Sequence, residues 1–311
     1  FAPREYRSPT MLEARAFEPD FLRKLDSLVL GIKRARTVRA GQRTLGRVQG
    51  LGIEPENFKD YAPGDDLRFL DWNAFARLDE LMLRTYRADR QVEVTSLIDA
   101  SASMGLPERD DKLGLALAIG ASLAYIGMAD NDAVRIGAFA MHRGSMKLEA
   151  TPFHRRRESY LNFKSFVTSV RAGGETRLGA AVDELLLQRR PAGTVVVISD
   201  FLVNEGDLED ALKRLVAARH DVKVIHVMGE QESTAAYPPG LYRIRDAETG
   251  EVRETVLGPT AIAAIRHKVE KIVAHIRHIC TTHAIIYAQA FGAANLEAFM
   301  ERELPLLGIV R

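Results

Sequence analysis

The chain has 311 residues, of which 46% are hydrophobic and 27% are charged, an ordinary composition for a globular protein that excludes disordered and fibrous classes. Its 43 basic and 42 acidic residues leave a net charge of +1, so bulk electrostatics argues against wholesale binding to nucleic acid or an anionic membrane. The length suits one large domain with additions, or two domains.

The single cysteine, Cys280, excludes an internal disulfide and a cysteine-rich zinc site, as expected in a reducing cytoplasm. It follows a helix-like pattern, so we interpret it as a packed side chain. No apolar run approaches the roughly 18 to 20 residues of a membrane span. Residues 1–10 carry an acid and lack the apolar core of a signal peptide. We therefore expect a soluble cytoplasmic protein with no transmembrane segment.

The sequence pattern of residues 1–90 differs from that of the rest of the chain and predicts an N-terminal extension. One helix is expected over residues 19–36, with Asp20 placed to cap it. Its apolar residues recur at helical spacing: Phe21, Leu22, Leu25, Leu28, Val29 and Ile32.

A basic stretch follows this helix, with six basic residues and no acid between residues 31 and 50. It could dock on an anionic surface or on a partner. A solvated linker or partner-facing arm is favoured because no aromatic residues are interleaved. The basic residues are Lys33, Arg34, Arg36, Arg39, Arg43 and Arg47.

Residues 63–72, PGDDLRFLDW, join a Pro-Gly turn to several charges and to Trp72, the only tryptophan. We interpret them as a clasp that fixes the extension onto the following domain, with paired charges around a buried Trp72 ring. The alternatives are a docking face for a partner or an acid pair for hydrolysis. The charged residues are Asp65, Asp66, Arg68, Asp71, Arg77 and Arg84.

From residue 91 to 311, strand-like and helix-like patterns alternate. This predicts an α/β fold with a doubly wound, mostly parallel sheet, which is a Rossmann-type arrangement. The expected strands cover residues 92–99, 133–139, 194–200, 222–228 and 284–290. The expected helices cover residues 112–128, 157–170, 176–190, 206–220 and 260–281. Residues 241–257 predict a hairpin attached to the sheet, with its turn at Thr249-Gly250.

Oxygen-bearing side chains lie where three segments of this sheet reach one edge. Asp99, Ser101 and Ser103 come at the end of the first strand, and Asp200 closes the strand over residues 194–200. Thr176 follows Gly173 and Gly174, which allow a tight turn. Because ligands collect at the carboxyl ends of parallel strands, we expect these side chains to converge at exposed loop ends.

Two carboxylates and three hydroxyls provide only hard oxygen ligands, which suit magnesium, with manganese or calcium as alternatives. Because the protein supplies few anions, the ion would retain affinity for a carboxylate from another protein. This favours adhesion to another protein through the metal over catalytic turnover of a substrate. Taken alone, Asp-x-Ser-x-Ser is commonly no more than a helix cap or turn, because both residue types favour those positions.

These residues resemble the metal-ion-dependent adhesion site (MIDAS) of von Willebrand factor A domains, whose pattern is D-x-S-x-S, a threonine and an aspartate. The resemblance implies that Asp99, Ser101, Ser103, Thr176 and Asp200 form a metal site.

A second resemblance covers residues 41–286, including FKDYAPGDDLRFLDWNAFARLDELMLRTYRADR, LIDASASM and the hairpin. It is to the domain-of-unknown-function 58 family, bacterial and archaeal A-domain-like proteins commonly found beside MoxR-type AAA+ ATPases. It implies a MoxR-type ATPase as partner. Many members carry N-terminal membrane helices and a β-sandwich, which this sequence lacks.

Three functions therefore compete. The leading one is a non-enzymatic adaptor that holds a protein through its metal, as a chaperone-like or assembly factor. A metal-dependent hydrolase using Asp99 and Asp200 is the alternative, although the sequence has no G-x-S-x-G elbow and no P-loop lysine. The third is an anion or nucleic-acid binder through residues 33–47. The histidines, including His226, are expected to be packed or surface residues.

Overall fold

The computed structural model describes residues 10–31, 57–62, 67, 70–85, 92–142, 144–202, 205–230, 232, 238–245, 251–292 and 296–310. The chain divides into two compact units. The larger unit comprises Phe1–Ile32 and Val92–Arg311, and the smaller unit comprises Lys33–Gln91.

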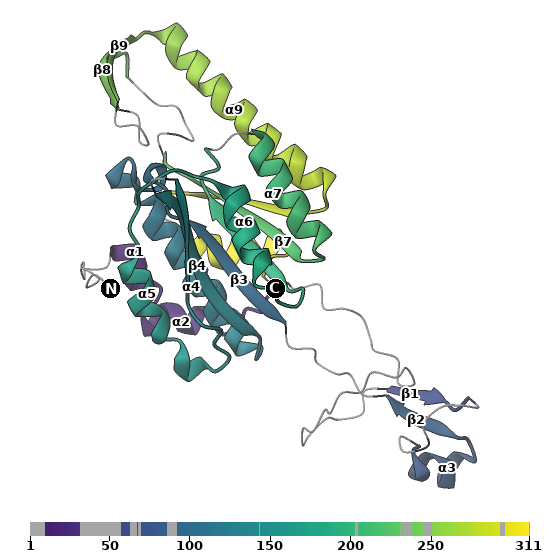
Figure 1. Ribbon diagram of the computed structural model, residues 1–311. Coiled ribbons are helices and arrows are strands. Elements are labelled where there is room, and N and C mark those ends of the chain that lie inside the picture. Colours follow the sequence, from purple (N-terminus) through teal and green to yellow (C-terminus); the bar gives the residue numbers. More distant parts are fainter. Residues whose placement is uncertain are drawn as a thin grey trace. The chain divides into compact units, whose positions relative to one another are not determined.

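The larger unit is built on a six-stranded sheet with the order β10-β7-β6-β3-β4-β5 (Figure 1). All neighbouring strands are parallel except β4 and β5. The predicted α/β fold with a mostly parallel sheet is therefore confirmed. The strands are β3 (Glu93–Asp99), β4 (Ala133–His142), β5 (Ser145–Ala150), β6 (Thr194–Ser199), β7 (Asp221–Met228) and β10 (Ile286–Phe291).

All five predicted strands are present, and β5 is the addition that the sequence does not predict. It pairs only with β4, at the edge of the sheet, and none of its side chains is fully buried. A strand of this kind carries no apolar run, so its sequence gives little signal.

Helices cover both faces of the sheet. Along β3, Leu97 packs in one hydrophobic cluster and Ile98 in the other, and every residue of β6 is buried. Strands buried on both faces have no polar side, which is why they read as continuous apolar runs. One face is covered by α4 (Lys112–Ala129) and α5 (Asn162–Ser169), and the other by α6 (Leu178–Leu187), α7 (Glu205–Ala217) and α9 (Pro259–Thr282).

Short helical turns complete this unit. Three of them are 3₁₀ turns, and a π-helical turn, η6, lies between two α-helical turns near the end of the chain. They are η2 (Ala102–Gly105), η3 (Glu108–Asp110), η4 (Arg157–Ser159), α10 (Leu296–Ala298), η6 (Phe299–Glu303) and α11 (Leu304–Leu306).

The central helix α4 is apolar on nearly all sides. A Cβ at Gly120 would lie 2.7 Å from Ile98 Cδ1, so this glycine lets α4 approach β3 closely. Among the described residues, Glu108–Ala129 is the one helical segment long and apolar enough to cross a membrane by length and composition, and 89% of its most apolar window is buried inside the fold. The expectation that no run approaches such a length is therefore wrong, because a helix buried all round carries no polar face.

Two short helices, α1 (Met11–Arg15) and α2 (Pro19–Leu25), precede the sheet. A capping box begins α1: the Glu13 backbone N–H donates to Thr10 Oγ1 at 3.3 Å, and the Thr10 N–H donates to Glu13 Oε2 at 2.9 Å. The helix predicted over residues 19–36 is shorter than expected, since α2 ends at Leu25.

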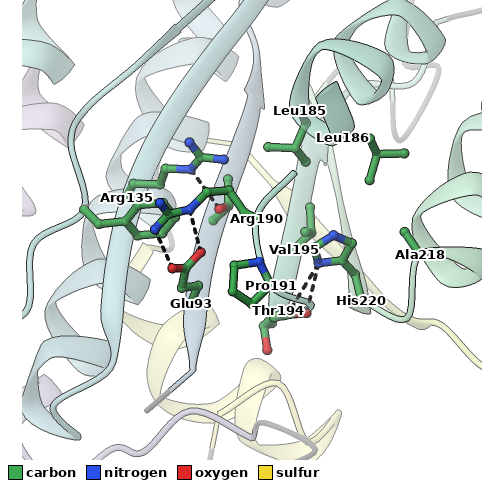
Figure 2. A pocket seen from close by; sticks show the side chains of 13 residues that line it. Glu93, Arg135, Leu185, Leu186, Arg190, Pro191, Thr194, Val195, Ala218 and His220 are labelled. Carbon is green, nitrogen blue, oxygen red and sulfur yellow. Dashed lines mark hydrogen bonds and ion pairs between the residues drawn. The ribbon is translucent and has the colours of Figure 1, made fainter. Parts of the chain in front are cut away.

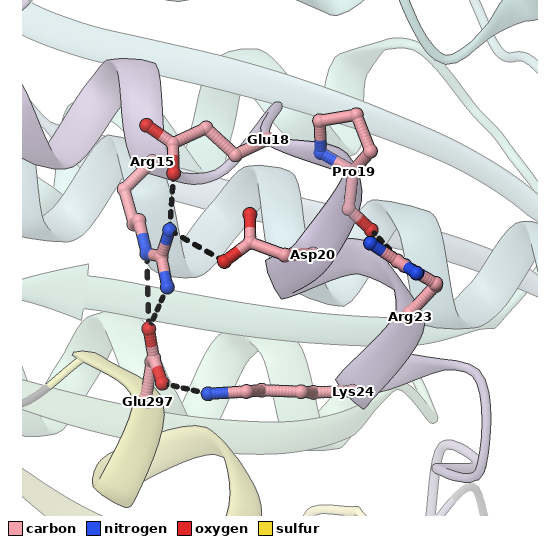
Figure 3. A network of polar contacts seen from close by, with 7 residues as sticks. All are labelled: Arg15, Glu18, Pro19, Asp20, Arg23, Lys24 and Glu297. Atoms are coloured by element: carbon pink, nitrogen blue, oxygen red, sulfur yellow. Dashed lines mark hydrogen bonds and ion pairs between the residues drawn. The ribbon is translucent and has the colours of Figure 1, made fainter.

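Ion pairs join these helices to α10. Arg15 pairs with Glu18, Asp20 and Glu297, and Lys24 pairs with the same Glu297 carboxylate (Figure 3). Asp20 therefore belongs to this network and does not cap α2 as predicted. Exposed pairs contribute little stability singly, but a shared carboxylate fixes the two helices relative to α10.

Apolar burial places the same helices within the larger unit. Phe21 and Leu25 are fully buried in the cluster that contains α4. The structure thus assigns residues 10–31 to the sheet unit, whereas the sequence places them in a separate extension over residues 1–90. The reason is that the apolar face of α2 must be covered, and α4 is the surface that covers it.

The smaller unit contains the antiparallel strands β1 (Asn57–Asp60) and β2 (Met82–Thr85), together with α3 (Trp72–Leu78). Asp71 caps α3, because its Oδ1 accepts hydrogen bonds from the backbone N–H groups of Asn73 and Ala74 at 2.9 and 3.2 Å.

Trp72 is 64% exposed, and its ring meets Phe75 edge-on with centroids 6.4 Å apart. The smaller unit by itself therefore leaves this ring exposed, because the buried side of the short helix α3 is at Ala74. The predicted burial of Trp72 against the following domain stays a prediction. The remainder of the clasp, including Asp65, Asp66 and Arg68, and the basic stretch at residues 33–47 lie outside the described residues.

The predicted hairpin is present as β8 (Gly240–Arg245) and β9 (Val252–Leu257), an antiparallel pair. It forms its own two-stranded sheet and is not attached to the main sheet as expected. Its turn at Thr249-Gly250 lies outside the described residues.

Candidate metal site

The first loop of the site begins where β3 ends, at Asp99. This side chain is fully buried, and its Oδ1 accepts a hydrogen bond from the Ser101 backbone N–H at 2.8 Å. Such a turn fixes the carboxylate against its own chain. The hydroxyls of Ser101 and Ser103 lie 3.1 Å apart, and both residues are buried. The Asp-x-Ser-x-Ser stretch therefore gathers its three oxygen-bearing side chains into one cluster.

The second loop follows β6 and carries Asp200, which is 2% exposed. Ser199 links the two strands: its hydroxyl donates to Asp99 Oδ2 at 2.6 Å and accepts from the Phe201 N–H at 2.8 Å. Asp200 Oδ1 accepts from the Leu202 N–H at 3.3 Å. The two aspartates are thus held side by side at the carboxyl ends of neighbouring strands, where ligands of such sheets collect.

The third loop carries Thr176. Two backbone hydrogen bonds join this loop to the first loop. The Ala102 N–H donates to the Gly174 carbonyl at 3.0 Å, and the Gly173 N–H donates to the Ala100 carbonyl at 2.8 Å. Gly174 has a φ of +79°, a conformation that glycine adopts without strain.

All five predicted residues are 9% exposed or less. The expectation of exposed loop ends is wrong on this point, because the three loops cover one another at the sheet edge.

A lysine that the sequence analysis does not single out lies in the same cluster. Lys112, the first residue of α4, is 1% exposed. Its ammonium group lies 2.9 Å from Asp200 Oδ2 and 2.9 Å from Glu232 Oε1. Burial acts to lower the pKa of Lys112, but the two carboxylates outweigh it and raise the pKa overall, so the lysine is charged. The one available signal was a lysine opening an otherwise apolar helix.

Electrostatics distinguish the two aspartates. Asp99 receives only neutral hydrogen-bond donors from the described residues, while Asp200 has the Lys112 ammonium. Burial, followed by repulsion from Asp200, raises the pKa of Asp99 to about 7, although the hydrogen bonds from Ser199 and Ser101 act against the rise. A cation next to Asp99 would oppose both causes of this shift, because it stabilises the ionised carboxylate.

The ligand set fits a hard cation. Asp99, Ser101, Ser103, Thr176 and Asp200 supply oxygen atoms only, which is the chemistry of magnesium, manganese and calcium sites. Within the described parts of the chain, no three His, Cys, Asp or Glu side chains gather as a metal cluster, so hydroxyl ligands would be needed.

Neither His226 nor Cys280 adds a functional group to this site. His226 Nδ1 lies 2.9 Å from the Tyr287 hydroxyl, and burial lowers the pKa of His226 to about 4. Cys280 is 1% exposed, and burial raises the pKa of its thiol to about 12. The predictions that these two side chains are packed are confirmed.

Residues 57–279 match the family described as "Protein of unknown function DUF58". The chain belongs to this family. Uncharacterized proteins of Mycobacterium bovis and Mycobacterium tuberculosis are 29% identical to it over 276 residues, which cover 86% of each chain.

Among solved structures, the chain is similar to the BatB protein of Bacteroides thetaiotaomicron, with 20% identity, a TM-score of 0.43 and coverage of 70% of this chain and 98% of that one. The VWA domain of SpRpn10 is 13% identical, with a TM-score of 0.42 and coverage of 70% and 96%. These are distant likenesses.

Proposed function

We propose that this DUF58 protein is a non-enzymatic adaptor that binds another protein through a divalent metal ion. The observation that carries the proposal is the gathering of Asp99, the two serines and Asp200 in one buried cluster, with the Thr176 loop tied against it.

Asp99, Ser101, Ser103, Thr176 and Asp200 would hold the ion, for which magnesium is the best fit. When bound, the ion would supply a positive charge and a coordination position for an oxygen atom from outside the chain.

Lys112 favours adhesion over hydrolysis at such a site. Because its ammonium group already neutralises part of Asp200, Asp99 is the one site aspartate that lacks a cation among the described residues. With the Lys112 charge offsetting one of the three carboxylates of this cluster, those of Asp99, Asp200 and Glu232, a doubly charged ion would be balanced and not over-neutralised. An open coordination position on it would then be available to an acidic side chain of a partner. A hydrolase would also need a residue placed to activate water, and the buried His226, which interacts with Asp200, is neutral and bonded to Tyr287.

The resemblance to family members found beside MoxR-type genes makes a MoxR-type AAA+ ATPase the proposed partner. In this role the chain would hold a client or the ATPase itself through the metal, as a chaperone-like or assembly factor.

Magnesium binding tests the first half of the proposal. Magnesium chloride should raise the Tm of the wild-type protein by several degrees relative to chelator, because an ion that binds only the folded state stabilises it. Asp99→Asn preserves the shape and the acceptor for the Ser101 N–H but removes the charge, so it should keep the circular dichroism spectrum and lose the magnesium-dependent rise. Asp183→Asn, an exposed site in α6, is the matched control. An equal rise in Asp99→Asn and wild type would contradict a metal at this site.

Partner capture tests the second half. The wild-type chain should retain its AAA+ ATPase in magnesium and release it in chelator, while Asp99→Asn should not retain it in either. Undiminished capture in chelator would show that the metal is not the contact. Turnover of a generic phosphoester that is lost in Asp99→Asn would favour the hydrolase instead.

A further inference from the structure

A cavity lies at the opposite edge of the sheet from Asp99 and Asp200. It has a volume of about 250 Å³ and is bounded by the first residues of β3, β4 and β6, whereas the metal site follows the carboxyl ends of β3 and β6 (Figure 2). No part of the proposed adaptor function uses it.

Arg135, from β4, is the main charged group of this cavity and is 7% exposed. Its Nε donates to Thr95 Oγ1 at 3.0 Å, and one terminal nitrogen donates to Gln188 Oε1 at 2.7 Å. Both partners are neutral, and none of the described carboxylates lies within ion-pair distance of Arg135. A buried guanidinium with no carboxylate in direct contact is unfavourable, and an anion beside it would reduce that cost.

Arg190 places a second guanidinium group over the same aromatic ring as Arg135. Arg135 and Arg190 both lie over the ring of Phe153, with their Cζ atoms 4.6 and 4.8 Å from its centroid. Arg190 is paired with Glu93, so that carboxylate neutralises Arg190. Two guanidinium groups against one carboxylate leave this wall of the cavity with a net positive charge.

The facing wall is apolar. Leu185 and Leu186 from α6 and Ala218, the residue after α7, line it, opposite the two arginines (Figure 2). His220 completes the lining; its Nδ1 lies 3.2 Å from the Gly193 backbone nitrogen. The cavity therefore has a cationic wall and an apolar wall, as small-molecule sites commonly do.

We propose that this cavity binds a small organic acid, with its carboxylate or phosphate held by the two arginines and its apolar part against the leucine wall. The planar guanidinium donors match either anionic group.

Four sodium salts at constant ionic strength test the proposal: acetate, hexanoate, inorganic phosphate and hexyl phosphate. With metal-free wild-type protein, at least one of the two tailed anions should raise the Tm relative to chloride, by about 3 °C at ten times its Kd. Acetate and inorganic phosphate should raise it less. The comparison of hexanoate with hexyl phosphate identifies the preferred anionic group.

Two variants locate the effect. Arg135→Gln removes the charge, and Ala218→Leu fills the cavity without changing charge; both should lose the rise. Ala217→Leu, one residue away and exposed, is the control and should keep it. Asp99→Asn should also respond like wild type, which separates this cavity from the metal site.

Three results would overturn the proposal: no anion raises the Tm above chloride, the tailed and tailless anions act equally, or Ala218→Leu responds like wild type. Because Ala218→Leu retains Arg135, it keeps the proposal testable if Arg135→Gln fails to fold.

Discussion

At the scale of single residues, the balance of charge among a few buried side chains determines the properties of the site. Asp99 and Asp200 lie at neighbouring strand ends, and only Asp200 has a cation beside it, the Lys112 ammonium. Removing one member of a buried ion pair leaves the other charge uncompensated, which costs far more than the pair contributes.

Lys112→Met should therefore destabilise the metal-free protein by about 3–5 kcal/mol, because Asp200 would remain buried without this partner. The measurement is urea unfolding in chelator. Magnesium should restore part of the loss, since a divalent ion would take over the role of the ammonium group. Lys164→Met, on the exposed face of α5, is the control and should change stability by no more than about 0.5 kcal/mol. A Lys112→Met protein as stable as wild type in chelator would show that Asp200 does not depend on this pair.

At the scale of elements, the N-terminal helices are part of the core and not an appendage. α2 buries Phe21 and Leu25 in the cluster that contains α4, and the Glu297 carboxylate joins α1 and α2 through Arg15 and Lys24. Burial of large apolar side chains contributes more to this docking than the exposed ion pairs.

Phe21→Ala should lower the free energy of unfolding by about 3–5 kcal/mol, the cost of removing a buried phenylalanine and leaving a cavity. Chemical denaturation measures the change. Met11→Ala, at a position that is 91% exposed, should alter it by about 0.5 kcal/mol or less. If the two variants were equally mild, the N-terminal helices would contribute nothing to the stability of the sheet unit.

At the scale of the whole molecule, buried ionisable groups couple global stability to pH. His226 is 2% exposed and has its pKa lowered to about 4, while an unfolded chain would protonate it near pH 6.5. The unfolded state therefore binds more protons between these values, so stability from His226 is present above pH 6.5 and is lost as the pH falls toward 4. Asp99, whose pKa is raised to about 7, acts in the opposite direction in metal-free protein.

The difference between wild type and His226→Gln isolates the histidine, because Asp99 is common to both. Relative to the variant, wild type should lose about 2–4 kcal/mol between pH 7 and pH 4, measured by urea unfolding in chelator. A difference that does not change with pH would mean that His226 accepts a proton as readily in the folded protein as in the unfolded chain.

The sequence by itself predicted the alternation of strands and helices, and it singled out Asp99, Ser101, Ser103, Thr176 and Asp200, whose role as a metal site stays a prediction. Runs such as TVVVIS can be predicted as strands because a strand covered on both faces has no polar side. Asp99 and Asp200 can be predicted to lie close together because parallel strands end at one edge of the sheet. Only the tertiary structure decided that α2 belongs with the sheet, that β5 extends it and that α3 buries Ala74, not Trp72, within the smaller unit. It also brought Lys112 to Asp200 across 88 positions and placed Arg135 and Arg190 around Phe153. A local pattern records which face a side chain must bury, but not which distant residue covers it, so contacts between remote segments depend on the folded chain.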